Sequence, residues 1–221
     1  MGDGAAGATA ATGRRRRPYA ARVPIDVRRE QLLDAALAVI VRDGYAGVSI
    51  DAIAREAGVT RPVVYGAYDG LGALLFALLD RQQARALAGL EGALPDPTDP
   101  ATLRDPRGAL LRTVRTLVER VSEDPDTWRP ILLAAAGTPA EVAARIEGDR
   151  ERFRGQLAGI LGLGLAAARI DADADLLAHA VLAVMERFGG LVLGQPDVYT
   201  ADRLVTTVDA VLAAVGVPPA Q

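Results

Sequence analysis

Residues 48–68 read VSIDAIAREAGVTRPVVYGAY and predict two short helices joined by a tight turn. Ser49 is a good N-cap for the first helix, because its hydroxyl can accept a hydrogen bond from a backbone N–H that the first turn leaves unpaired. Gly58 marks the end of that helix, since glycine enters the left-handed conformation at little cost. Thr60 is placed to cap the second helix, and Pro62 falls in its first turn, where the missing N–H costs nothing. This order of helix, glycine-containing turn and helix is the layout of a DNA-binding helix-turn-helix.

The residues around this stretch form a spaced set of short motifs. The set consists of Leu33–Ala36 on a preceding helix, Gly44-Tyr45 at its end, Ile53-Ala54…Ala57-Gly58-Val59-Thr60, and Tyr65-x-x-Tyr68. Together they resemble the N-terminal domain of TetR-family transcriptional regulators over about residues 27–79. The resemblance implies an N-terminal DNA-binding domain, a C-terminal domain that binds a small effector, and a two-fold dimer. Where the family often has a glycine, a histidine, a phenylalanine and a lysine, this chain has Pro62, Ala67, Tyr68 and Leu71.

The N-terminal part of the second helix is expected to meet base edges in the major groove. Arg61 could pair with guanine through two hydrogen bonds, and Thr60 could contact a phosphate as well as cap the helix. Two valines could meet thymine methyl groups, although at least one of them is expected in the core. The resemblance assigns a phosphate contact to Tyr65, whereas Tyr68 could either contact phosphate or close the core. The candidate DNA contacts are Arg28, Ser49, Thr60, Arg61, Val63, Val64, Tyr65 and Tyr68.

The net charge of −3 is divided unevenly along the 221 residues. Residues 1–68 hold ten arginines and seven acids, which gives +3, and the remainder carries −6. A basic end attracts phosphates while an acidic end is repelled, so this division would orient the molecule on DNA. Asymmetry of this size also arises by chance, and only the helix-turn-helix in the positive part favours the functional interpretation.

Residues 1–22 are predicted to form a disordered basic arm, because they have low complexity and almost no apolar pattern. Arg14–Arg17 is the notable feature of the arm. It is either a solvated charge run or a flexible segment that adds DNA contacts beside the helix-turn-helix. No signal peptide and no apolar run long enough to cross a bilayer were identified, which predicts a soluble, cytoplasmic protein.

The rest of the chain predicts helices only, so the expected fold class is all-α. The expected domains are residues 23–69, which bind DNA, and residues 70–221, which bind an effector and dimerise. A helix capped by Asp26 is expected over about 27–43, and Pro95–Pro106 is expected to form a surface loop. Further helices are expected over about 70–90, 106–122, 127–136, 139–161, 173–194 and 201–215.

The last two predicted helices are apolar on more than one side. A helix that is apolar around most of its circumference needs a partner on both sides. The family resemblance implies that these helices join two subunits in a four-helix bundle. The alternative is a large monomeric core.

Catalytic and metal-binding residues are scarce. The chain has one histidine, no cysteine and two serines, so nucleophilic catalysis, disulfides and thiolate metal sites are not expected. Asp171-x-Asp173-x-Asp175 begins like a calcium loop but lacks the glycine and glutamate that such a loop requires, and helix capping explains it better. Gly162-x-Gly164-x-x-Ala167 imitates a dinucleotide fingerprint but follows a helix rather than a strand. No enzyme activity, metal or cofactor is expected.

The effector candidates are large or polar side chains set among alanine and leucine, although each could simply be core. They are Trp128, Leu132, Phe153, His179 and Met185. His179 is the strongest of them, because a polar ring on an apolar helix needs a partner. We therefore expect a TetR-like repressor of a pseudo-palindromic operator, and the family resemblance implies that it is a dimer and that an effector releases it from DNA. An activator or effector-independent regulator is one alternative, and an all-α ligand-binding or enzymatic protein is another.

Overall fold

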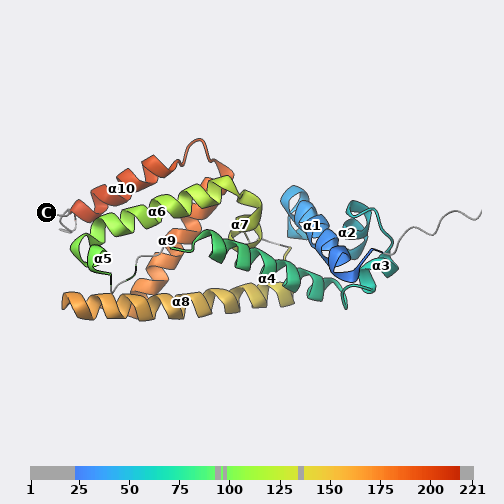
Figure 1. Ribbon diagram of the computed structural model, residues 1–221, viewed down its shortest axis with the longest axis horizontal. Coiled ribbons are helices and arrows are strands. Elements are labelled where there is room, and N and C mark those ends of the chain that lie inside the picture. The colour runs from blue at the N-terminus through green and yellow to red at the C-terminus, as the bar shows by residue number, and fades with distance from the viewer. Residues whose placement is uncertain (1–22, 93–95, 97–98, 134–136, 215–221) are drawn as a thin grey trace, which may run out of the picture.

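The computed structural model describes residues 23–92, 96, 99–133 and 137–214. It is all-α, as the sequence predicted, and no strand occurs in these ranges. One end of the molecule holds the first three helices, and α4 and α8 run lengthwise from that end into the rest of the structure (Figure 1). The elements are α1 (Ile25–Asp43), η1 (Tyr45–Gly47), α2 (Ile50–Glu56), α3 (Arg61–Tyr65), α4 (Leu71–Gly89), α5 (Pro100–Arg104), α6 (Pro106–Glu123), α7 (Pro125–Leu132), α8 (Ala140–Ala168), α9 (Ala174–Gly194) and α10 (Ala201–Ala214).

Several helices begin with an aspartate whose side chain caps the first turn. Asp173 accepts hydrogen bonds from two backbone N–H groups at the start of α9, so the calcium-like pattern is a helix cap. The predicted Pro95–Pro106 loop is wrong in part, because Asp99 caps the short helix α5. Asp26 does not cap α1, which begins one residue earlier with Pro24 at the N-cap position. α8 continues to Ala168, so the glycines of the apparent dinucleotide fingerprint lie within a helix.

The first core packs α1, α2 and α3 against α4. Its most buried members include Leu32, Ile53, Val64 and Leu74, each with 0% of its surface exposed. The first two turns of α8 also enter this core through two residues, Val142 and Ile146. The end that holds the helix-turn-helix therefore shares its hydrophobic interior with α8, the longest of the described helices.

The second core joins the C-terminal ends of α4, α6 and α9 to α7 and α10. Trp128 is its bulkiest buried member and is 9% exposed. The other buried members are Ala86, Val118, Val121, Val192, Leu193 and Leu204. α4 takes part in both cores, so it connects them mechanically.

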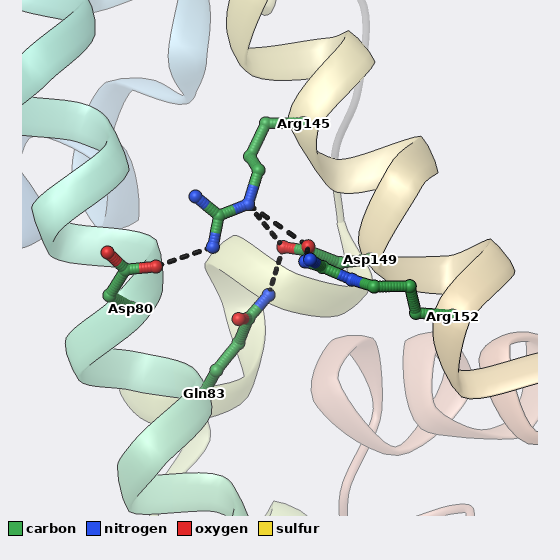
Figure 2. Close-up of polar contacts among 5 residues, drawn as sticks. All are labelled: Asp80, Gln83, Arg145, Asp149 and Arg152. Atoms are coloured by element: carbon green, nitrogen blue, oxygen red, sulfur yellow. Dashed lines mark hydrogen bonds and ion pairs between the residues drawn. The ribbon is translucent and has the colours of Figure 1, made fainter. Parts of the chain in front are cut away.

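A polar cluster holds α4 against α8 between the two cores (Figure 2). Arg145 donates to Asp80 at 2.5 Å and, through Nε, to Asp149 at 3.0 Å. Gln83 donates to the same Asp149 carboxylate at 2.5 Å, and Arg152 also contacts it. Asp149 is the most enclosed charge of the cluster, with 12% of its side chain exposed. The cluster fixes the register of α8 along α4.

The hydroxyl of Tyr45 provides a second polar contact, which joins η1 to α7. It donates to the carbonyl oxygen of Pro130 on α7 at 3.3 Å, and the side chain is buried. Burial raises the pKa of Tyr45 to about 12 from its usual value of 10.

Alkaline pH should therefore destabilise the protein through Tyr45. Above pH 10 the unfolded chain loses the phenolic proton while the folded protein keeps it, so the free energy of unfolding falls as pH rises from 10 toward about 12. We expect Tyr45→Phe to remove part of this pH dependence and to cost about 1 kcal/mol near neutral pH. Urea unfolding at several pH values measures both effects. Equal pH dependence in the two proteins would contradict the prediction.

Candidate nucleic-acid interface

The turn between α2 and α3 has the geometry that its sequence predicts. The hydroxyl of Ser49 accepts a hydrogen bond from the backbone N–H of Ala52 at 3.1 Å, which confirms the predicted cap. Gly58 has a φ of +64°, in the left-handed region. The next N–H, of Val59, donates to the carbonyl of Ala54 at 2.9 Å and closes the helix end. These bonds fix the direction in which α3 leaves the turn.

Two buried residues anchor α3 and its end to the first core. Val64 is 0% exposed and Ala67 is 5% exposed. Val64 is therefore a core residue and not a DNA contact, which corrects the sequence prediction that included it. The cause is helical spacing, since adjacent residues point in directions about 100° apart. Val63, beside it, is 37% exposed and remains a candidate for a base contact.

The exposed side of α3 presents polar groups that could bind DNA. Tyr65 is 51% exposed, and the side chain of Arg61 is 56% exposed. Thr60 is exposed at the N-cap position, but its side chain makes no cap hydrogen bond, contrary to the prediction. Its hydroxyl is therefore not committed to the helix end.

Arg61 has an acidic neighbour that sequence analysis did not identify as a site residue. Its Nη1 donates to Oδ2 of Asp51 at 3.3 Å, and both side chains are more than half exposed. A side-chain hydrogen bond with Tyr65 and the negative charge of Asp51 raise the pKa of Arg61. Asp51 belongs to α2, whereas Arg61 and Tyr65 belong to α3. Asp51 is ten residues from Arg61 along the sequence, so their contact becomes visible only when the turn is folded.

The two candidates at the edges of this surface have internal partners. Arg28 donates to Gln31 one turn along α1 at 2.9 Å. Tyr68 is half-buried against the first core, and the guanidinium of Arg29 lies 5.9 Å from the centre of its ring. Burial raises the pKa of Tyr68. These contacts favour the core role for Tyr68, and its phosphate contact stays a prediction.

The candidate effector residues lie in three different places. Trp128 and Leu132 belong to the second core. Phe153 and Met185 line an open pocket of about 450 Å³. His179 borders a separate, more polar pocket between α8 and α9, with 58% of its side chain exposed, and lies 4.0 Å from Asp175. The other residues that line the pocket are Leu87, Ala88, Leu90, Glu91, Gly92 and Leu117. Only Phe153 and Met185 among the five candidates therefore border the same cavity.

α9 has a second apolar face that is exposed in the single chain. Leu176 is 67% exposed and Val184 is 50% exposed, and Val211 on α10 is 56% exposed. By length and composition α9 could also cross a membrane, contrary to the sequence expectation, although such a match is weak when it concerns a single helix. Glu186 lies within α9 and pairs with Arg150 of α8 at 2.6 Å. This charged pair favours a helix that packs against protein over one surrounded by lipid.

Residues 32–78 match the family model described as bacterial regulatory proteins, tetR family. These residues place the N-terminal segment of the chain in the TetR family. The matched residues run from α1 to α4 and include the whole helix-turn-helix.

Known proteins extend the similarity beyond this segment. The chain is 34% identical over 126 residues to the HTH-type transcriptional activator FasR of Mycolicibacterium smegmatis, across 57% of this chain and 55% of that protein. A TetR-like transcriptional regulator from Rhodococcus sp. RHA1 superposes with a TM-score of 0.64 and 27% identity, across 88% of this chain and 100% of that one. The matched segment thus spans about half the length of FasR. These relatives are transcriptional regulators and not enzymes.

A third protein shares the fold at lower identity. FadR from Bacillus subtilis, solved in complex with stearoyl-CoA, has a TM-score of 0.63 and 18% identity, across 83% of this chain and 96% of that one. Its similarity supports the same arrangement of an N-terminal helix-turn-helix and a C-terminal helical domain.

Proposed function

We propose that this TetR-family protein regulates transcription in the cytoplasm as a homodimeric repressor of a pseudo-palindromic operator. The observation that carries the proposal is the exposed surface of α3, where Arg61 and Tyr65 point outward while Val64 anchors the helix in the core. An exposed arginine can read guanine in the major groove, and an exposed phenol can donate to a phosphate. In this proposal residues 23–69 bind DNA. Residues 1–22 lie outside the described residues, and their DNA contact stays a prediction.

Dimerisation is supported by the outward apolar face of α9 and α10. Leu176, Ala180 and Val184 recur every fourth residue along α9 and are all exposed in the single subunit. Burial of such a stripe against its symmetry mate would remove apolar surface from water, which is the main driving force for association. A two-fold pair also matches a two-fold symmetric operator.

The effector of the proposed repressor would be a small apolar molecule bound beside Phe153 and Met185. The pocket volume of about 450 Å³ falls in the range of small-molecule sites, and most lining residues are apolar. A fatty acyl chain belongs to this class, and stearoyl-CoA is bound by FadR of Bacillus subtilis, which has the same fold. A ligand here would touch α4, which enters both cores. It could therefore change the position of the DNA-binding end.

Phe153→Asp should weaken effector binding without affecting DNA binding. A carboxylate in an apolar pocket loses hydration that an acyl chain cannot replace, so affinity for the ligand should fall about tenfold or more. A panel of fatty acids and acyl-CoAs, with thermal shift as the readout, measures this effect. Gln156→Asp is the matched control, because Gln156 is exposed on the same helix and does not line the pocket. Equal responses of the two variants to the panel would contradict the location of the site.

An activator of the same fold is the second candidate, because the relative FasR is a transcriptional activator. A reporter gene under an operator recovered from the source genome separates the two candidates. Deletion of the regulator should raise reporter output if the protein represses and lower it if the protein activates.

Salt dependence tests the proposed DNA binding itself. A protein that neutralises phosphates releases counterions, so affinity for duplex DNA should fall steeply between about 50 and 200 mM salt. Fluorescence anisotropy with a labelled mixed-sequence duplex measures the slope. Absence of binding at the lowest salt concentration would overturn the proposed function.

A further inference from the structure

Asp51 is an acidic residue on the surface that is proposed to face DNA, where its negative charge would be repelled by phosphates. It lies in the first turn of α2, its side chain is 57% exposed, and it contacts Arg61. A carboxylate at a surface that meets phosphates weakens binding to every sequence. Favourable interaction with the helix dipole could explain an acid in this turn, but it does not require contact with an arginine of the next helix. The contact itself therefore needs another explanation.

The geometry leaves Arg61 able to read a base while Asp51 holds it. The hydrogen bond engages Nη1, at 3.3 Å from Oδ2, and a guanidinium has five N–H donors in a fixed planar fork. Guanine presents two acceptors in the major groove, so the donors that remain after the contacts with Asp51 and Tyr65 suffice for it. The side chain is 56% exposed, and it starts at the first residue of α3, the part of a recognition helix that meets base edges.

We infer that Asp51 is a specificity-determining positioning residue for DNA recognition, an inference that rests on the proposed function. Its carboxylate orients the guanidinium of Arg61 toward guanine and prevents it from turning to a phosphate. A phosphate contact adds affinity but carries no sequence information. Asp51 thus lowers the affinity for DNA of any sequence and increases the discrimination between bases. Specificity can arise in this way, because it depends on the difference between the affinities for right and wrong sequences.

Asp51→Asn should relax base preference and strengthen non-specific binding at the same time. The preference for guanine at one position of each half-site should fall about five- to tenfold, at the lower end of the range of discrimination that one bidentate contact gives. Binding to unrelated duplex DNA should become tighter, and the slope of its salt dependence should steepen by about one phosphate contact per subunit. A residue that served only the stability of α2 would change neither the preferred base nor the slope.

A double-mutant cycle tests the inference. Wild type, D51N, R61A and the double variant are each used to select bound sequences from random duplex DNA, and are then titrated against the wild-type site and its single-base variants. Glu56→Gln is the control, because Glu56 is an acid of the same helix that pairs with Arg42, at 2.8 Å. If Asp51 acts through Arg61, adding D51N to R61A should leave base preference unchanged. Asp51→Ser, which also suits a helix start, repeats the test should D51N unfold.

The outcomes separate this inference from the proposed function. Recovery of a motif by wild type together with an unchanged guanine preference in D51N would overturn the role of Asp51 alone. Additive losses of preference in the double variant would also overturn it. Failure of wild type to enrich any motif would overturn the proposed function and, with it, this inference.

Discussion

Replacing Val184 with glutamate should convert the protein to monomers and lower its affinity for a two-half-site operator by about 100-fold or more. Val184 is 50% exposed in the single subunit and lies on the outward apolar face of α9. In a two-fold pair each subunit would bring its glutamate toward the same buried surface, where the charge loses hydration and has no partner. Each monomer then binds one half-site independently, so the increase in operator affinity that comes from joining two DNA-binding domains is lost.

Leu110→Glu is the matched control for this experiment. Leu110, like Val184, is an exposed aliphatic residue of the C-terminal region, with 41% of its surface exposed. It lies on α6 and therefore outside the apolar face of α9 and α10. Sedimentation velocity should show a monomer for V184E and the wild-type assembly for L110E. A wild-type protein that is already monomeric, or a V184E variant that remains dimeric and binds normally, would rule out this interface.

Replacing Ile146 with alanine should cost about 2–4 kcal/mol of unfolding free energy, the usual loss for a buried isoleucine. Ile146 is 4% exposed and lies in the first core, although it belongs to α8. The shared core also predicts that the DNA-binding end loses stability together with α8. Intrinsic fluorescence and far-ultraviolet circular dichroism during urea unfolding should therefore shift to lower denaturant together.

Ile160→Ala on the same helix provides the comparison, because Ile160 is 48% exposed. Its substitution should cost less than about 1 kcal/mol, since little apolar surface is lost from a packed site. Similar losses in the two variants would mean that α8 does not enter the first core as described.

The helix-turn-helix could be predicted from sequence because its determinants are local. Ser49, Gly58 and Pro62 each act within one turn of a helix, and the structure places them at a cap, a left-handed turn and a first helical turn. The same local logic failed at Thr60, which occupies the cap position without making the bond. It also failed at Asp26, because the helix begins at Ile25, one residue before the expected cap.

The features that sequence analysis missed depend on contacts between distant segments. The pairing of Asp51 with Arg61 requires the turn to fold back, and periodicity reports only which face of one helix is apolar. Insertion of Val142 and Ile146 into the first core joins residues about 70 or more positions away from α3. The separation of His179 from Phe153 likewise follows from their different faces on packed helices, since both were expected among apolar neighbours.

Selection of bound sequences from random duplex DNA tests the central claim most directly, because that claim is that the exposed side of α3 reads DNA in a two-fold pair. The wild-type protein should enrich an inverted repeat whose half-site centres lie about one helical turn of DNA apart or a multiple of it. R61A should lose the preference at one position of each half-site, and Tyr65→Phe should weaken binding to all sequences alike. Enrichment of no motif, or of a motif that R61A reads as wild type does, would contradict the account.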